Sequence, residues 1–152
     1  INRVFDKHDW ESYKPLEYFD IDFVQEMKQK LDMFLPHSTN RRELVHGDFG
    51  KDNAIIREGI ICGVIDWGNS CYGDHFFDVG RVILYSYNSE MATREAMKYY
   101  SESDSEAYRE RMLVGVYFTI MADYGFAALN KNETPCRSAR NKIDKIERLF
   151  DS

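Results

Sequence analysis

The sequence contains few cysteines, and no two of them have the spacing of a paired motif. Cys62, Cys71 and Cys136 are the three, and no C-x-x-C motif occurs. An odd number of widely spaced cysteines argues against a disulfide framework and against a zinc cluster. We therefore expect free thiols and a cytoplasmic location, because the cytosol keeps thiols reduced.

The sequence also lacks an excess of positive charge. Lys and Arg number 20 against 26 Asp and Glu, which gives a net charge of −6 and a sequence pI near 5.2. Nucleic acids and anionic membrane surfaces are bound by basic patches, so we expect neither as a partner. The acidic balance is compatible with a cationic ligand.

Long apolar segments are missing as well. No apolar run approaches the ~20 residues of a membrane span. The start of the chain has no charged and apolar regions of the kind that form a signal peptide. Because the first residue is Ile1 rather than Met, we interpret the chain as part of a longer polypeptide.

The sequence does contain a mostly helical pattern with one β-rich cluster. Its 152 residues, 43% of them hydrophobic, fit one domain over 1–152 with its own core. Asp74 and Ser89 are the expected N-caps of two helices, and Pro135 opens the last helix. The expected elements are helices over 20–35, 75–87, 90–100, 105–129 and from 134 onward, and strands at 43–46, 54–57 and 60–65. Because helices and strands do not alternate, the pattern predicts an α+β, mostly helical fold.

A predicted hairpin brings polar residues together beside the β-rich cluster. A Glu-Gly pair at 58–59 stands between two β-rich runs and predicts a tight turn. Pairs counted outward from this turn place Asn53 opposite Val64, with Asp66 two residues further on the same face. Amide and carboxylate oxygens suit Mg²⁺, which keeps waters and substrate phosphates as its other ligands. The pattern therefore predicts a magnesium site at the hairpin mouth.

Asp48 lies five residues before Asn53 and could reach a substrate hydroxyl beside such a metal. Phosphoryl transfer uses a metal on the phosphates and a carboxylate that orients the nucleophile and accepts its proton. Taken alone, Asp48 is explained as a turn former and His46 as a hydrogen-bonded structural residue. The catalytic interpretation rests on the combination and spacing of these residues.

These segments resemble a known family. The run H-G-D-F-G-K-D-N at 46–53, followed by V-I-D-W at 64–67, resembles the catalytic loop and metal-binding motif of aminoglycoside phosphotransferases and their choline-kinase relatives. Within that family it is most similar to the hygromycin B phosphotransferases. The run Y-G-D-H-F-F-D-V at 72–79 resembles the family's G-D-x-x-x-D stretch. The resemblance covers residues 44–82 and implies the C-terminal lobe of a protein-kinase-like fold, with an antiparallel hairpin at the active site.

The resemblance implies the chemistry of the site. Asp48 would be the catalytic base, and Asn53 and Asp66 would hold Mg²⁺. The implied cofactors are this metal ion and ATP, with GTP as an alternative donor. The implied activity is transfer of the γ-phosphate to a hydroxyl group of a small molecule.

It also implies supporting roles around that site. Asp78 would support the catalytic loop through backbone hydrogen bonds, together with His46. Ile55 and Ile65 would lie where the family contacts the adenine ring, although packing in the core explains these two residues equally well.

Two features depart from the pattern of the wider kinase fold. Gly50 stands two residues after Asp48, where protein kinases place a Lys, and Lys51 comes next. Only 47 residues precede Asp48, and they are predicted to form one helix and loops. We therefore expect that the N-terminal nucleotide-binding lobe is absent from this chain and that the chain alone is inactive. The surface exposed by the missing lobe would favour a homodimer.

Acidic side chains on the later helices are candidates for binding the acceptor, because aminoglycosides carry ammonium groups. Glu102, Asp104 and Glu106 are explained by the preference for negative charge at a helix N-terminus. Asp123 lies within an apolar run and is the substrate-binding candidate, since carboxylates are rarely buried without a partner. A position on the outer face of its helix is the alternative.

The sequence thus predicts the catalytic lobe of an ATP-dependent phosphotransferase that acts on an aminoglycoside-type antibiotic. Three alternatives stay open at this point. The first is a kinase of a choline-like or sugar-like metabolite, and the second is an isolated lobe without catalysis. The third, a metal-dependent phosphatase, is disfavoured because two-metal sites need several His and carboxylate ligands, and the sequence has only four His residues and no G-N-H motif.

Overall fold

The computed structural model describes residues 8–38, 42–103 and 107–151. Its helices are α2 (Ile21–Phe34), α3 (Phe76–Tyr85), α4 (Ser89–Glu102), α5 (Tyr108–Leu129) and α6 (Glu133–Phe150), with short 3-10 turns η1 (Trp10–Tyr13), η2 (Leu35–His37), η3 (Lys51–Asn53) and η4 (Trp67–Asn69). Its strands are β1 (Glu43–Val45), β2 (Ala54–Arg57), β3 (Ile60–Val64) and β4 (Cys71–Gly73). The predicted α+β, mostly helical fold is confirmed.

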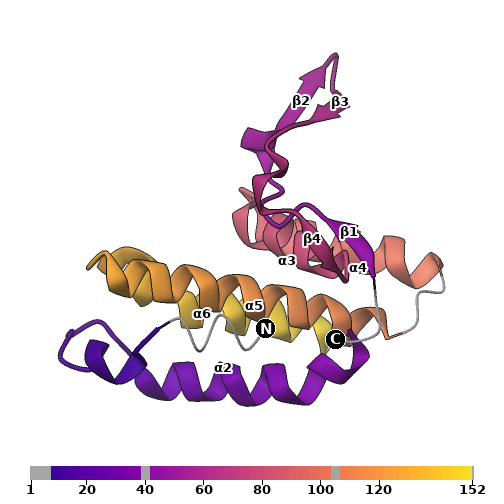
Figure 1. Cartoon of the computed structure of the whole chain (residues 1–152). Helices are drawn as coiled ribbons and strands as arrows, with labels where there is room; N and C mark the ends of the chain where they lie inside the picture. The colour runs from indigo at the N-terminus through magenta and orange to yellow at the C-terminus, as the bar shows by residue number, and fades with distance from the viewer. Residues whose placement is uncertain (1–7, 39–41, 104–106, 152) are drawn as a thin grey trace.

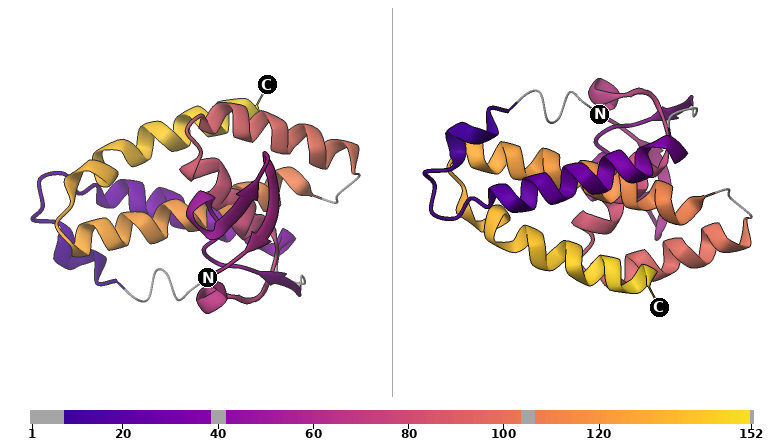
Figure 2. Two further views of the ribbon diagram at one scale, coloured as in Figure 1. Left: turned by 90° about the horizontal axis from the view of Figure 1, so that it is seen from above. Right: turned by 90° about the horizontal axis from the view of Figure 1, so that it is seen from below.

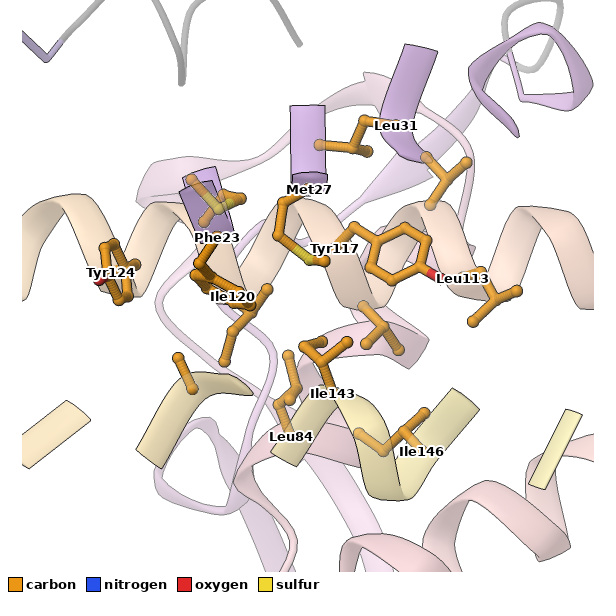
Figure 3. Packing of buried hydrophobic residues seen from close by; sticks show 14 of the residues in the cluster. Phe23, Met27, Leu31, Leu84, Leu113, Tyr117, Ile120, Tyr124, Ile143 and Ile146 are labelled. Carbon is orange, nitrogen blue, oxygen red and sulfur yellow. The ribbon is translucent and has the colours of Figure 1, made fainter. Parts of the chain in front are cut away.

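The core is built around α5, which contacts α2, α3 and α6. Fourteen residues of α5 are buried, so this helix is enclosed by its neighbours rather than lying on the surface. Figure 3 shows the packing of Phe23, Met27 and Leu31 from α2, Leu113, Tyr117, Ile120 and Tyr124 from α5, and Ile143 and Ile146 from α6. The buried apolar residues of α2 and α6 therefore face this central helix.

Two glycines let α3 approach α5 closely. A Cβ on Gly80 of α3 would collide with the backbone of Gly115, and a Cβ on Gly115 would collide with the carbonyl of Phe76. Because the two backbones touch at this crossing, α3 is held directly on the core helix. The side chains of α3 that point away from α5 are therefore placed on a rigid support.

The composition of α5 corrects the expectation that no apolar segment of the chain is as long as a membrane span. This helix is long and apolar enough to span a membrane by length and composition, and it is the one such helix among the described residues. However, 72% of its most apolar window is buried inside the molecule. The apolar character of α5 is accounted for by its place in the core.

The strands form two separate two-stranded antiparallel sheets. β1 pairs with β4, whereas β2 and β3 form the predicted hairpin, with left-handed backbone at Glu58 and Gly59 in the turn. Figure 1 shows the hairpin projecting away from the helices, while the first sheet lies beside α3. Strand β4 is not among the strands expected from the sequence, because it forms only by long-range pairing with β1.

The ends of two helices differ from prediction. Asn88 rather than Ser89 caps α4, because its extended backbone lets its side chain accept from the N–H of Met91. Helix α6 begins at Glu133, with Asn132 as its cap, so Pro135 is its third residue. In both cases an asparagine just upstream supplies the capping oxygen.

The start of α3 also differs, because the predicted cap has a second partner. His75 occupies the cap position, while the Asp74 side chain accepts from the N–H of Phe76 at 3.1 Å. The same buried carboxylate pairs with the Arg111 guanidinium through contacts of 2.7 and 2.8 Å. Asp74 therefore joins the start of α3 to α5. The two views of Figure 2 place these helices across one another.

Candidate active site

The loop that follows β1 is held by a carboxylate from α3. The backbone N–H groups of His46 and Gly47 donate to the two oxygens of Asp78 at 2.7 and 2.9 Å. Gly47 has a φ of 78°, and a Cβ at this position would collide with the carbonyl of Asn69. Only glycine fits here, so the loop turns tightly onto the first turn of α3.

His46 connects this loop to the segment after β3. Its Nε2 lies 2.8 Å from the carbonyl oxygen of Ile65, and the N–H of Asp48 donates to its Nδ1 at 3.3 Å. These contacts assign the proton to Nε2. The ring is 3% exposed and lies against Trp67, with centroids 4.7 Å apart. Since both ring nitrogens make hydrogen bonds, His46 supports the structure of the loop and has no ring nitrogen available to accept a proton.

Asp48 presents a partly exposed side chain at the surface of the loop, with 38% of it accessible. The side-chain amide of Asn53 donates to the backbone carbonyl of Asp48 at 2.9 Å, which joins the two ends of the loop. The Asp48 carboxylate pairs with the Arg81 guanidinium from α3. Sequence reasoning missed Arg81. Its position three residues after Asp78, on the same helix face, is the signal that could have found it.

The register of the hairpin corrects the predicted geometry at its mouth. A β-bulge between Ile55 and Ile56 shifts the pairing by one, so Ala54 rather than Asn53 lies opposite Val64. Asn53 instead ends the short turn η3, and its carbonyl accepts from the N–H of Ile65 at 3.0 Å. The predicted shared strand face is therefore wrong. The hydrogen bond from the N–H of Ile65 nevertheless pairs Asn53 with the residue that directly precedes Asp66.

The side chains at this mouth suit a magnesium ion. The amide nitrogen of Asn53 is used by the Asp48 carbonyl, which leaves its Oδ1 as a ligand atom. Asp66 is exposed and has left-handed backbone, with φ 61°. One amide oxygen and one carboxylate are the hard oxygen donors that Mg²⁺ prefers when phosphates and waters complete its shell.

Within the described residues, one other cluster has ligand-like spacing, and it is explained by ion pairing. Glu43, Asp74 and His75 lie close together away from the hairpin. However, the Asp74 oxygens face Arg111, and the Glu43 carboxylate lies 2.6 Å from Nδ1 of His75. These groups already satisfy one another. They do not form the two-metal centre that the phosphatase alternative requires.

Ile55 and Ile65 lie at the surface rather than in the core. Each is 48% exposed. Plain core packing, which was one explanation for these residues, is therefore wrong. Both offer apolar surface on the hairpin, next to Asn53 and Asp66 in the chain.

Asp123 is partly buried and has a partner on α3, in line with the expectation that a carboxylate in an apolar run is rarely buried alone. The hydroxyl of Tyr85 lies 2.6 Å from both Asp123 oxygens. Burial raises the pKa of Asp123, and the Tyr85 and Arg81 side chains oppose that shift only in part. Burial and Asp123 in turn raise the pKa of the Tyr85 hydroxyl. Of the other acidic candidates, Glu102 is exposed, and Asp104 and Glu106 lie outside the described residues.

Open space adjoins the loop in more than one place. A cavity of about 300 Å³ lies between β4, α3 and α5, with Gly47, Arg81 and Phe118 among its lining residues. A wider hollow of about 580 Å³ lies between the loop, α3 and α4, with His46 and Trp67 among its lining residues. A small molecule therefore has room beside the loop that carries Asp48.

Comparison with known sequences places this arrangement in a family. A model of the phosphotransferase enzyme family, APH, matches residues 3–113. The chain is 39% identical over 44 residues to hygromycin-B 4-O-kinase of Escherichia coli. The aligned segment is 29% of this chain and 13% of that protein. It is 28% identical over 107 residues to acyl-CoA dehydrogenase family member 11 of Pongo abelii, which covers 69% of this chain and 14% of that protein.

Solved structures have the same fold. A thermostable mutant of aminoglycoside phosphotransferase APH(4)-Ia, in a ternary complex with ADP and hygromycin B, superposes with a TM-score of 0.67 at 21% identity over 96% of this chain. An apo form of that enzyme gives a TM-score of 0.63 at 23% identity. The chain spans about half the length of these solved chains, 50% in both cases, and a much smaller part of the sequence relatives. With its family model, its motifs and its fold in agreement, the chain belongs to the phosphotransferase enzyme family.

Proposed function

We propose that the chain supplies the catalytic lobe of an ATP-dependent phosphotransferase that moves the γ-phosphate to a hydroxyl of a small molecule. The observation that carries this proposal is the position of Asp48, on a loop held by Asp78 and next to the hairpin ends that carry Asn53 and Asp66. Membership of the phosphotransferase enzyme family supports it. GTP is the alternative donor.

In this proposal Asp48 orients the acceptor hydroxyl and takes its proton. The hydrogen bonds from the loop backbone to Asp78 position Asp48 before a substrate arrives, so little reorganisation is needed for reaction. His46 is not the base, because both of its ring nitrogens already make hydrogen bonds.

Asn53 and Asp66 would hold Mg²⁺, and Ile55 and Ile65 would face the adenine ring. Held by these two residues, the metal would supply positive charge that offsets the charge developing on the nucleotide phosphates. Asn53 contributes its remaining amide oxygen, and Asp66 contributes an exposed carboxylate. The two isoleucines supply exposed apolar surface on the same hairpin.

The acceptor we propose first is an aminoglycoside-type antibiotic. Similarity to hygromycin-B 4-O-kinase and to a fold solved with hygromycin B supports this class. Asp123, connected to Asp48 through Tyr85 and Arg81, offers a carboxylate for an ammonium group. Similarity to acyl-CoA dehydrogenase family members supports testing other hydroxylated compounds beside aminoglycosides.

A second candidate is a lobe that folds but does not catalyse the transfer without the rest of its polypeptide. The hairpin exposes Ile55, Ile56, Ile60 and Ile61 by 48–69% each, so a nucleotide would be covered from one side only. We therefore expect activity to require the rest of the natural polypeptide. The same exposed isoleucines would favour a homodimer of the isolated chain.

The test is acceptor-dependent, Mg²⁺-dependent ADP release by the full natural polypeptide that contains these residues. The acceptor panel includes hygromycin B, other aminoglycosides, choline and simple sugars. Asp48→Ala and Asp66→Ala are compared with Asp32→Ala, a matched control whose side chain is 59% exposed on α2. We expect Asp48→Ala to lower kcat by at least about 100-fold.

Three results would contradict the proposal in different ways. No release with any acceptor would argue against the phosphotransferase reaction. Release that is indifferent to Asp48→Ala and Asp66→Ala would refute the site assignment. Release by the isolated chain at the rate of the full polypeptide would refute its predicted inactivity.

A further inference from the structure

Helix α3 contacts the loop that carries Asp48 at two places, one helical turn apart. Asp78 accepts the N–H groups at the start of the loop, and Arg81 pairs with the carboxylate of Asp48 itself. Residues three apart lie on the same face of a helix. The same rigid face therefore holds both the backbone of the loop and its functional side chain.

Arg81 is itself held in place from the other side. Its guanidinium lies over the ring of Tyr85, 4.9 Å from the centroid, where a cation is attracted by the ring electrons. The Tyr85 hydroxyl is fixed in turn by Asp123 at 2.6 Å. A continuous series of contacts thus runs from Asp48 through Arg81 and Tyr85 to α5.

The pair differs from an ordinary surface ion pair. Arg81 is 24% exposed, whereas Arg94, which pairs with Glu90 one turn away on α4, is 58% exposed. Surface pairs within one helix contribute little to stability. Asp48 and Arg81 are 33 residues apart in sequence and come together only through the fold.

One atom of Arg81 argues against a purely structural role. Its Nε is buried and has no hydrogen-bond partner among the described residues. A buried donor without an acceptor destabilises a fold, and such groups are rare in native proteins. The side chain therefore keeps its place despite this penalty. The group that benefits directly is the Asp48 carboxylate.

We propose that Arg81 is the positioning residue for Asp48. This inference rests on the proposed phosphotransferase reaction. The guanidinium holds Oδ1 of Asp48, so Oδ2 is the oxygen presented to the acceptor. As the acceptor oxygen bonds to the γ-phosphorus, the bond from that phosphorus to the β-phosphate oxygen breaks, and the hydroxyl proton passes to Asp48. The positive charge of Arg81 also offsets repulsion between this carboxylate and the incoming phosphate.

The experiment measures kcat and KM for Arg81→Met and Arg81→Lys in the full natural polypeptide with its best acceptor. We expect Arg81→Met to lower kcat by about 10- to 100-fold, because a misplaced reacting group loses rate, with KM for the acceptor within about threefold of wild type. Arg81→Lys should recover part of this loss, because its point charge reaches the carboxylate without the fork geometry of guanidinium. Arg137→Met, which removes an exposed pair with Glu133 on α6, is the matched control.

A double-mutant cycle separates positioning from a direct role. If Arg81 acts only through Asp48, Arg81→Met in an Asp48→Ala background should change the residual rate by less than about twofold. Thermal melts accompany each variant. Arg81→Met should unfold cooperatively near the wild-type temperature, because the substitution also removes a buried unpaired donor.

Several outcomes would overturn the inference. Unchanged kcat in Arg81→Met, or a raised KM with kcat unchanged, would show that Arg81 does not position the base. An equally large loss in the Asp48→Ala background would show that it acts independently. If Arg81→Met fails to fold, an Arg81→Lys variant that folds but recovers no more activity than Asp48→Ala would refute positioning by charge. Wild-type protein without turnover would refute the proposed function and this inference with it.

Discussion

Removal of the Asp78 carboxylate is the sharpest test of how the loop is held. Asp78→Ala would leave the N–H groups of His46 and Gly47 without acceptors that now lie at 2.7 and 2.9 Å. Hydrogen bonds to a charged group contribute about 1.5–3 kcal/mol each. Asp78 is only partly buried, so water can replace part of the lost interaction. We therefore expect the free energy of unfolding to fall by about 2–3 kcal/mol, which is at or below the lower limit of about 3 kcal/mol for two such bonds.

The assay is thermal unfolding combined with amide hydrogen exchange in the full natural polypeptide. A loss of this size corresponds to a fall in Tm of about 5–10 °C for a domain of this length. Protection of the His46 and Gly47 amides should fall by at least about tenfold. Asp78→Asn should lie between wild type and Asp78→Ala, because an amide keeps one acceptor oxygen and turns a donor toward the other N–H.

Asp32→Ala is the control for this experiment. Its side chain is 59% exposed and pairs with Lys28 within one helix, so its loss should change stability by less than about 0.5 kcal/mol. The reasoning would be refuted if Asp78→Ala melted with the control and kept its two amides protected. The loop would then be held by its other contacts, such as those of His46.

Two further predictions concern the core. Burial alone would raise the pKa of Asp74, but hydrogen bonds from Arg111 and the Phe76 N–H hold it below its usual range. A lowered pKa contributes stability that is complete above the unfolded value near 3.9 and is lost as pH falls through the folded value. Asp74→Asn should therefore lower stability at pH 7 by about 3–5 kcal/mol, because the buried Arg111 charge loses the carboxylate that neutralises it. The loss of stability below pH 4 should also become flatter. Equal urea midpoints of wild type and variant at pH 7 would contradict this. Burial raises the pKa of Cys136 to about 11. In the folded chain, the exposed thiols of Cys62 and Cys71 should therefore react rapidly with an alkylating reagent at pH 7.5, whereas Cys136 should react only on unfolding. Equal reaction rates for the three thiols would contradict this.

The sequence by itself determined the fold class and the combination of residues that points to phosphotransferase chemistry. The apolar stripes of α2 and α6 and the turn at 58–59 are local patterns, which depend on residues a few positions apart. The H-G-D-F-G-K-D-N run is local too, so the spacing of Asp48 and Asn53 along the chain is enough to single them out. Capping was harder to predict, because neighbouring polar residues such as Asn88 and Ser89 compete for the same position.

Only the tertiary structure decided how these pieces meet. The bulge that moved Asn53 off the predicted strand face arises in the pairing of two strands, and β4 exists only because β1 lies beside it. Arg81 reaches Asp48 across 33 residues, and Arg111 reaches Asp74 across 37. Side-chain partners at such separations are set by the packing of α3 on α5. That packing depends on the whole core rather than on any single segment.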